Sequence, residues 1–281
     1  MRNRNIAILT LLFAVLLPAH LAGLSEAALA AGDQTYHFGF KKSRNGEPAS
    51  IDQEGFKPLL EKHGAFYIGD TESKALYLTF DNGYENGYTP PILDVLKAKR
   101  VPAAFFLTGH YVQSRPDLVK RMVEEGHLIG NHSWSHPDMT QLSDEAIRRE
   151  LDKVKEAVAA ITPQKEMDFF RPPRGIFSER VLAAGRRGGY IGVFWSIAYA
   201  DWDVNRQKGM RHAYESVVSQ LHPGAIILLH SVSRDNAEAL AAIIDEARRQ
   251  GYTFKSLDQL LSPQAKRSSE RGRHNPKQMA P

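Results

Sequence analysis

Ionisable side chains follow the carboxyl ends of several apolar segments in this chain of 281 residues. The first apolar run, 75–80, is followed by a carboxylate and an amide, and four later runs are followed by further groups of this kind: Asp81 and Asn82, His132 and His136, Arg171, Asp201, and His230. In parallel α/β proteins the carboxyl ends of the strands share one face, where enzymes place catalytic groups. We therefore expect these side chains to form one hydrolytic site.

His132 and His136 are separated by three residues. On one helical turn or in a tight loop this spacing points both imidazoles the same way, which is a common way to supply two ligands to a divalent metal. The alternative is a polar loop with capping histidines. The expected proximity of Asp81 at a neighbouring strand end favours the metal site.

His230 ends a very apolar run, where a histidine is often a hydrogen-bonded core residue. On the expected catalytic face it is a candidate general acid, with Asp201 as a partner that orients the ring and raises its pKa. Arg171 does not deprotonate, so we expect it to act as a fixed cation that orients Asp81. A purely structural ion pair is the alternative for Arg171 and Asp201.

Several aromatic residues lie near these positions and could stack on a sugar ring, although core packing explains each of them equally well. They are Trp134, Trp195, Tyr199 and Trp202.

The chain from about 71 to 261 alternates between apolar strands and amphipathic helices, which predicts parallel βαβ units. The predicted strands are 75–80, 103–107, 127–130, 168–170, 190–195, 225–229 and 253–255. The predicted helices are 91–99, 118–125, 144–161, 178–187, 211–221 and 236–250. Seven strands exceed a minimal flavodoxin-like sheet and approach the eight of a (β/α) barrel. The glycines in 185–189 do not follow a strand and indicate a helix end, not a dinucleotide-binding loop.

The two ends of the chain differ from this central part. Residues 1–30 have a basic start, an apolar stretch and a small-residue cleavage motif, which predicts a secretory signal peptide; an uncleaved membrane anchor is the alternative. Residues 31–70 are expected to form an extension that packs on a catalytic domain of residues 71–261. The polar, basic segment 262–281 is expected to be a disordered tail.

Charge and cysteine content limit the function classes. The chain contains no cysteine, which excludes disulfides and thiolate metal sites. The whole chain carries +4, while residues 1–30 carry +1 and residues 262–281 carry +4, so residues 31–261 carry −1. The basicity is therefore a property of the tail, and a nucleic-acid-binding domain is not expected. A solubilising role for the tail is favoured over contact with an anionic wall polymer or membrane surface.

Five ordered motifs over about 190 residues resemble the polysaccharide deacetylase family, also called the NodB-homology family or carbohydrate esterase family 4. They are the strand end Thr79–Asn82, the histidine pair His132–His136, the segment Arg171–Pro173, the pair Asp201–Trp202 and the strand end Leu228–His230. The resemblance implies a distorted (β/α) barrel, often with seven strands, which agrees with the strand count.

The resemblance also implies roles for individual residues. Asp81 takes a proton from water, Arg171 and Asp201 assist as orienting partners, and His230 protonates the departing amine. His132 and His136 hold a divalent metal ion, with zinc as the expected ion. Substrate contacts are expected from Tyr84, Trp202 and Pro173, and a backbone N–H near Tyr84 is a candidate donor to the oxyanion.

Asn82 departs from the family pattern, in which a second Asp serves as a metal ligand. A neutral amide oxygen binds a cation more weakly than a carboxylate, so we expect weakened metal binding. The segment 77–87 and the aromatic extension resemble one branch in particular. That branch comprises the PdaA-type muramic acid deacetylases of δ-lactam biosynthesis in bacterial spore cortex.

This resemblance predicts a secreted enzyme, associated with the cell wall or spore cortex, that removes the acetyl group of N-acetylmuramic acid from peptidoglycan glycan strands. No nucleic acid or integral membrane partner is implied. One alternative is an N-acetylglucosamine deacetylase acting on peptidoglycan or chitin-like oligomers. A second alternative, from a different class, is an inactive glycan-binding protein.

Overall fold

The structure, a computed structural model, describes residues 33–261. The signal peptide expected in residues 1–30 and the tail expected in residues 262–281 lie outside the described residues. Within the described range, no helix combines the length and the apolar character needed to cross a membrane.

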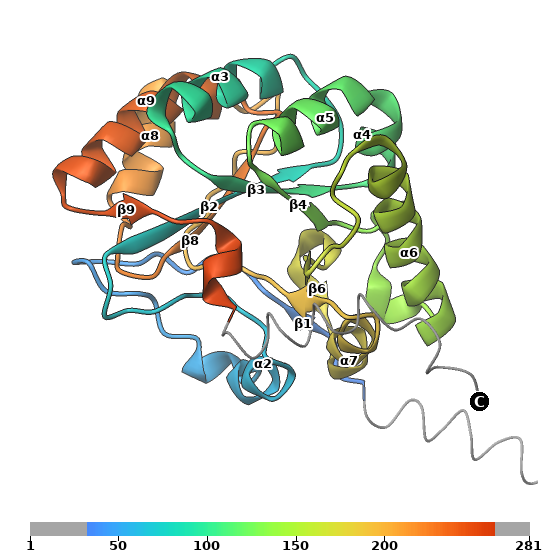
Figure 1. Cartoon of the computed structure of the whole chain (residues 1–281). Helices are drawn as coiled ribbons and strands as arrows, with labels where there is room; N and C mark the ends of the chain where they lie inside the picture. The colour runs from blue at the N-terminus through green and yellow to red at the C-terminus, as the bar shows by residue number, and fades with distance from the viewer. Residues whose placement is uncertain (1–32, 262–281) are drawn as a thin grey trace, which may run out of the picture. The chain divides into compact units, whose positions relative to one another are not determined.

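Seven parallel strands form the central sheet, in the spatial order β7-β5-β4-β3-β2-β8, with β9 also pairing with β2. Helices lie around the outside of the curved sheet (Figure 1). The strands are β2 (Ala75–Asn82), β3 (Ala103–Leu107), β4 (Leu128–Asn131), β5 (Phe169–Phe170), β7 (Ile191–Gly192), β8 (Ile226–His230) and β9 (Thr253–Phe254). The predicted seven-stranded, distorted (β/α) barrel class is confirmed.

Strand β2 pairs with three other strands, and all eight of its residues are buried. A strand without an exposed face must be covered on both sides, which is typical of parallel sheets. It pairs with β3 on one side and β8 on the other, with Asp81 opposite Phe106 and His230. This register brings Asp81 and His230 to the same level at the carboxyl ends of adjacent strands.

The barrel is incomplete between β7 and β8, and the segment after β7 partly fills this gap. Ile197 forms an isolated parallel bridge with Ile227, and the backbone N–H of Leu228 donates to the carbonyl of Ile197 at 2.9 Å. The chain from β7 to β8 therefore passes along the sheet before it reaches the loop that carries Asp201.

The helices are α2 (Lys57–His63), α3 (Thr89–Lys99), α4 (Gly109–Ser114), α5 (Pro116–Glu124), α6 (Asp144–Ile161), α7 (Glu179–Arg187), α8 (Met210–Val218) and α9 (Arg234–Arg249). Helix α6 begins after Ser143, whose side chain accepts from the N–H of Ala146 at 3.2 Å. It buries four apolar side chains at helical spacing, namely Ile147, Leu151, Val154 and Val158. The predicted bounds of this helix are confirmed.

Some predicted elements differ in extent, and others were not expected from the sequence. The strand predicted at 190–195 is regular only over β7, because the following backbone groups bond to other partners: the N–H of Phe194 donates to Phe66. Helices α2 and α4 are short, so their apolar spacing is too brief to indicate a helix.

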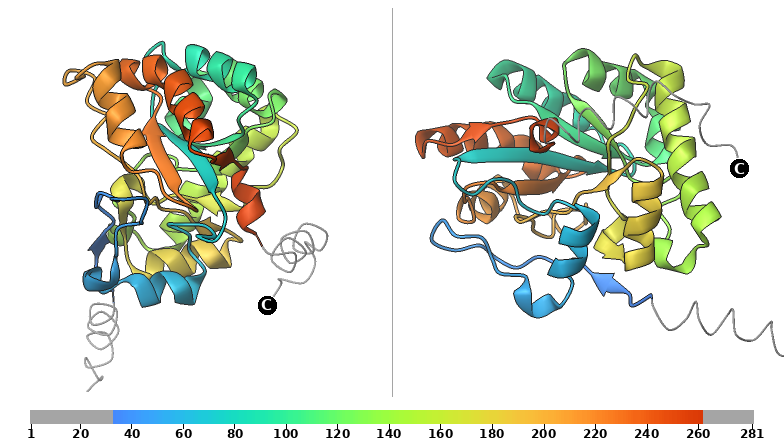
Figure 2. Two further views of the ribbon diagram at one scale, coloured as in Figure 1. Left: turned by 90° about the vertical axis from the view of Figure 1, so that its left-hand side faces the viewer. Right: turned by 60° about the horizontal axis from the view of Figure 1, so that its bottom comes forward.

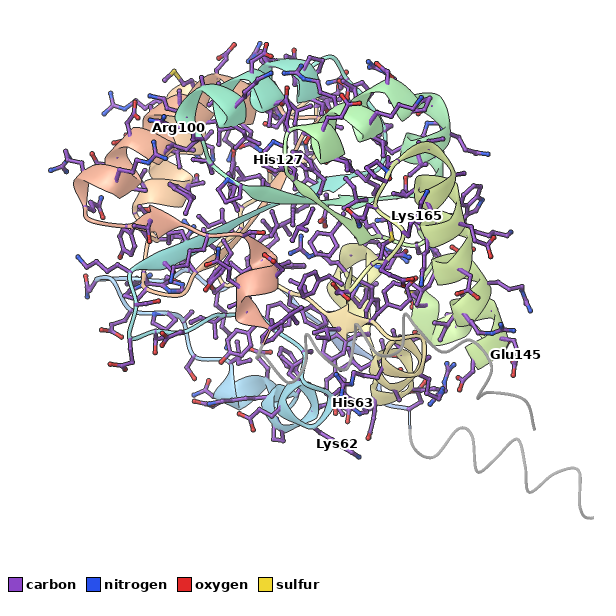
Figure 3. The ribbon with its side chains drawn as sticks, viewed as in Figure 1. Lys62, His63, Arg100, His127, Glu145 and Lys165 are labelled. Carbon is purple, nitrogen blue, oxygen red and sulfur yellow. The ribbon has the colours of Figure 1, made fainter. Side chains whose placement is uncertain are left out.

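The segment before β2 is attached to the rest of the described chain at several points. Strand β1 (Tyr36–His37) pairs antiparallel with β6 (Ile176–Phe177), and Phe38 is buried in the main core. Helix α2 lies beside α7, where Lys62 and His63 contact Glu179 (Figure 3). In both views of Figure 2 the segment before β2, coloured blue, runs along the lower part of the molecule. A domain boundary at residue 70 stays a prediction.

Gly185 allows helix α7 to approach strand β5 closely. A Cβ atom at this position would lie 2.4 Å from Cε1 of Phe170, a ring that is completely buried. We expect Gly185→Ala to lower the free energy of unfolding by about 1–3 kcal/mol, despite the better helix propensity of alanine. Urea denaturation provides the measurement. Gly39→Ala, at a position with open space, is the matched control, and equal stability of the two variants would contradict this account of the packing.

Candidate active site

A buried ion pair between Arg171 and Asp81 lies at the centre of the site. Arg171 follows β5, Asp81 lies near the end of β2, and Nη1 of Arg171 donates to Oδ1 of Asp81 at 2.6 Å. The arginine side chain has no exposed surface and the aspartate side chain is 7% exposed. Arg171 is therefore placed to orient Asp81, as expected from the sequence.

The Nη2 and Nε atoms of the guanidinium group are also hydrogen-bonded. Its Nη2 donates to Oγ1 of Thr79 at 3.0 Å and to the carbonyl of Phe194 at 3.2 Å, and its Nε donates to the carbonyl of Val193 at 2.9 Å. The group also lies 4.1 Å from the centre of the Phe106 ring. A buried cation is tolerated when its donors are satisfied and a carboxylate balances it. Four hydrogen bonds and the carboxylate of Asp81 stabilise the buried guanidinium group of Arg171 in this way.

The environment of Asp81 favours its ionised form. Burial alone raises the pKa of this carboxyl group, but the charge of Arg171 and the nearby imidazoles of His132 and His230, together with the hydrogen bond from Arg171, outweigh burial and lower it. Asp81 is therefore a carboxylate at neutral pH, and its Oδ2 lies 3.5 Å from Nε2 of His132.

A tight turn after β4 presents the two histidines. Ser133 and His136 both have left-handed backbone conformations, with φ values of 66° and 57°. The turn is stabilised by Asn131, whose Oδ1 accepts from the N–H of Ser133 at 3.0 Å, and by the Ser133 hydroxyl, which accepts from the N–H of His136 at 3.0 Å. The imidazole centres of His132 and His136 lie 4.9 Å apart.

Both imidazoles are suited to metal binding. The backbone carbonyl of Arg171 lies 2.9 Å from Nδ1 of His132, an arrangement in which Nδ1–H donates and Nε2 keeps a free lone pair. Burial is the main cause that lowers the pKa of both histidines, and the pKa of His136 falls to about 4. Two neutral imidazoles next to a carboxylate fit a divalent cation such as zinc.

The Asn82 side chain is fully buried and already hydrogen-bonded. Its Oδ1 accepts from the Ser231 hydroxyl at 3.0 Å, and its Nδ2 lies 3.5 Å from Oγ1 of Thr89. Among residues 33–261 there is no group of three or more His, Cys, Asp or Glu side chains arranged to hold a metal. The amide oxygen of Asn82 is therefore only a proposed third metal ligand. A metal ion would have to share this oxygen with the hydroxyl of Ser231.

His230 and Asp201 form the second acid–base pair. Oδ1 of Asp201 lies 2.6 Å from Nδ1 of His230, and Oδ2 accepts from the backbone N–H of His230 at 2.8 Å. Asn236 at the start of α9 donates to Oδ2 of Asp201 at 2.6 Å and to the carbonyl of His230 at 3.2 Å. Asp201 is almost completely buried, whereas the imidazole of His230 is 21% exposed.

The pair raises the pKa of His230 above its ordinary value. Burial lowers this pKa, but the charge of Asp201 and the hydrogen bond between the two groups outweigh the effect of burial. With Nδ1 bonded to Asp201, Nε2 is the nitrogen available for proton transfer. His230 is therefore suited to donate a proton near neutral pH.

The other sequence-predicted contacts differ in exposure. Trp202 is 47% exposed, with its ring 5.8 Å from that of His230, and Tyr84 is 44% exposed after the end of β2. Pro173 is buried, and the exposed side chain next to it belongs to Arg174. Trp195 is 5% exposed and belongs to the core, the second of the two explanations that the sequence left open for it. Trp134 and Tyr199 are only partly buried.

Three supporting residues were missed by sequence reasoning. Thr79 binds Arg171, Ser231 binds Asn82, and Asn236 holds Asp201. Thr79 lies inside a quoted motif, so its position gave a signal. Ser231 and Asn236 have no such signal, because serine and asparagine are common near the start of any helix.

The chain is similar to known polysaccharide deacetylases. The family profile described as polysaccharide deacetylase matches residues 68–193. The peptidoglycan-N-acetylmuramic acid deacetylase PdaA of Bacillus subtilis is 53% identical over 241 residues, covering 86% of this chain and 91% of that protein. The solved structure of that family 4 carbohydrate esterase gives a TM-score of 0.79 at 54% identity, with coverage of 81% and 97% of the two chains. The solved structure of a family 4 carbohydrate esterase from Bacillus anthracis gives a TM-score of 0.67 at 51% identity, and the match covers 81% of this chain and 96% of that chain.

Removal of the central cation should leave a buried, unpaired carboxylate. We expect Arg171→Gln to lower the free energy of unfolding by about 3–5 kcal/mol at neutral pH. Folding lowers the pKa of Asp81, so the ionised carboxylate stabilises the folded protein at pH values above 3.8, the ordinary pKa of this group. This stabilisation is lost as the pH falls through the lower pKa that Asp81 has in the folded protein. The difference from wild type should therefore shrink at low pH.

The measurement is urea denaturation of wild type and variant at pH 7 and at a pH well below 3.8, the ordinary pKa of the Asp81 carboxyl group. Arg174→Gln, at an exposed arginine three residues further on, is the matched control and should change stability by less than about 0.5 kcal/mol. A small loss for Arg171→Gln, equal at both pH values, would argue against a stabilising buried pair.

Proposed function

The chain belongs to the polysaccharide deacetylase family, carbohydrate esterase family 4, and we propose that it removes the acetyl group from N-acetylmuramic acid in peptidoglycan. The observation that carries the chemistry is the register of β2 and β8. It sets Asp81, kept ionised by Arg171, opposite His230, whose pKa is raised by Asp201. Two adjacent titratable groups with opposite protonation are what amide hydrolysis requires.

In the proposed reaction Asp81 accepts a proton from the attacking water while Arg171 fixes the direction of the carboxylate. The water oxygen bonds to the acetyl carbon, and the bond between that carbon and the sugar nitrogen then breaks. His230 gives its proton to the departing nitrogen, so that acetate and a free sugar amine are released. Asp201 and Asn236 hold the imidazole during this transfer.

We further propose that His132 and His136 hold a divalent ion, with Asn82 as a weak third ligand and zinc as the expected ion. Such an ion would polarise the acetyl carbonyl and lower the pKa of water. The lowered pKa values of both imidazoles keep them neutral and available for this role.

The peptide N–H of Tyr84 is our candidate for stabilising the oxyanion. The carbonyl of Gly83, in the same peptide unit, accepts from Oγ1 of Thr108 at 3.0 Å. Because the carbonyl and N–H of a trans peptide point in opposite directions, this bond fixes the Tyr84 N–H away from Thr108. A fixed backbone donor is suited to a developing negative charge.

Muramic acid differs from glucosamine by a lactyl carboxylate, which requires a cation. Arg174 is exposed, has a left-handed backbone with a φ of 58°, and its charge contributes to the lowered pKa of His136. We propose that this arginine reads the carboxylate. It supports muramic acid over the first alternative, an N-acetylglucosamine deacetylase.

The second alternative, an inactive glycan-binding protein, leaves this acid–base geometry unexplained, because a lectin needs neither a buried carboxylate–arginine pair nor a histidine of raised pKa. For the setting of the reaction, we propose secretion and action at the cell wall or spore cortex, with glycan strands as the partner. We also propose residues 31–70 as an extension and 71–261 as the catalytic domain.

The test of the proposed function is mass spectrometry of muropeptides after incubation of the purified protein with peptidoglycan, native or stripped of peptides by an amidase. We expect loss of one acetyl group from muramic acid in the peptide-free glycan, reduced by a chelator and restored by zinc. Asp81→Asn should lower the rate by about 10²–10⁴-fold.

Each other outcome leads to a different assignment. Loss of acetyl from glucosamine alone would identify the first alternative. Binding of glycan without any loss of acetyl, under every metal tested, would identify the glycan-binding alternative. Near-wild-type turnover by Asp81→Asn would refute the proposed mechanism.

The proton-donating role of His230 makes a prediction for the pH profile. Asp201→Asn removes the charge that raises the pKa of His230, so the protonated imidazole should be lost at lower pH. We expect the alkaline limb of kcat to move to lower pH and the rate at neutral pH to fall by up to about 10²-fold. Asp203→Asn, in the same loop, is the control. An alkaline limb at the same pH in Asp201→Asn and wild type would contradict the role of Asp201.

A further inference from the structure

Two exposed aromatic rings from distant parts of the sequence lie side by side, and one of them lies next to His230. The rings of Phe40 and Trp202 are 5.8 Å apart, and the ring of Trp202 is 5.8 Å from that of His230. Phe40 is 45% exposed and Trp202 is 47% exposed. Adjacent apolar rings left in water next to a catalytic group are typical of a ligand-binding surface.

Phe40 is held in place by the segment that precedes it. The backbone N–H of Phe38 donates to the carbonyl of Gly175 at 2.8 Å, and Nε1 of Trp195 donates to the carbonyl of Gly39 at 3.1 Å. The buried Phe38 ring stacks on Phe194 with the ring centres 4.6 Å apart. These anchors involve residues close to Arg171 or to its hydrogen-bond partners, so Phe40 is fixed relative to the catalytic groups.

A hollow of about 170 Å³ adjoins Phe40 on the side formed by the same segment. It is lined by aromatic rings together with polar groups, including Phe40, Tyr67, Lys41, Glu54 and Ser196. Lys41 and Glu54 form an ion pair within this lining. Aromatic faces combined with a few polar groups are suited to sugar rings, which have apolar C–H faces and hydroxyl edges.

We propose that Phe40 and Trp202 form a second sugar-binding subsite for a pyranose ring of the same glycan strand that lies outside the disaccharide unit whose muramic acid is deacetylated. This inference rests on the proposed function and extends it, because the segment before the barrel becomes part of the substrate groove. Trp202 connects this subsite to His230, and Phe40 extends it towards the hollow. The enzyme should therefore bind longer strands more tightly than a disaccharide.

A structural role for Phe40 is the competing explanation, in which its ring shields Trp202 and so supports His230. The two explanations differ in how the effect of a mutation depends on substrate length. Loss of shielding would disturb His230 equally for every substrate. Loss of a subsite would weaken only those substrates that reach it.

The experiment measures glycan affinity by isothermal titration calorimetry in the Asp81→Asn background, in which turnover is slowed. The probes are peptide-free peptidoglycan disaccharide and hexasaccharide. We expect Phe40→Ala to weaken the hexasaccharide by about 3- to 10-fold and to leave the disaccharide unchanged. Phe40→Tyr should restore the affinity, and Met210→Ala, at an equally exposed side chain on α8, is the matched control.

The deacetylation rates of the same variants with Asp81 intact provide the second readout. Phe40→Ala should raise KM for the hexasaccharide, with kcat and the pH profile unchanged. An equal loss of affinity for both lengths, a changed pH profile, or no effect at all would overturn the subsite. If the protein with Asp81 intact deacetylates no glycan, the proposed function fails and the subsite fails with it. An active enzyme without length dependence overturns the subsite alone.

Discussion

The site depends on one constraint, the burial of the Arg171 cation within the sheet. A guanidinium group without exposed surface needs hydrogen-bond partners and a carboxylate to balance its charge. Thr79 and Asp81 on β2 and the carbonyls after β7 satisfy these needs, and the backbone carbonyl of Arg171 orients His132. A single residue thereby links three segments to the proposed catalytic carboxylate and to one proposed metal ligand.

Around this cation, two pairs with opposite protonation lie at the ends of adjacent strands. Asp81 next to Arg171 keeps its negative charge, and His230 next to Asp201 gains affinity for a proton. Both carboxylates are buried, so the opposite protonation of the two pairs comes from the partner of each carboxylate. Asp81 has a permanent cation as its partner, and Asp201 has an imidazole that can bind a proton. This separation lets one site both accept and donate a proton at the same pH.

Much of this arrangement could be predicted from the sequence, because long apolar runs determine β2, β3 and β8, and β2 and β8 end in ionisable or polar groups. Serine at position 143 and the apolar spacing after it similarly predict α6 with its correct bounds. The missing parts depend on tertiary contacts. The orientation of Asn82 follows from Ser231 on another strand end, Asp201 is held by Asn236 on α9, and Phe40 reaches Trp202 only because β1 pairs with β6. No local pattern encodes such contacts, and the short strands β5 and β7 are likewise defined by their neighbours.

The protonation of Asp81 is the most direct test of this account. The measurement is the ¹³C chemical shift of its side-chain carboxyl group as a function of pH, in protein labelled at aspartate and assigned by comparison with Asp81→Asn. The account predicts that this carboxyl group titrates below the ordinary value of 3.8. Titration clearly above that value would show that burial outweighs Arg171, and would contradict the claim that the buried cation keeps the catalytic base ionised.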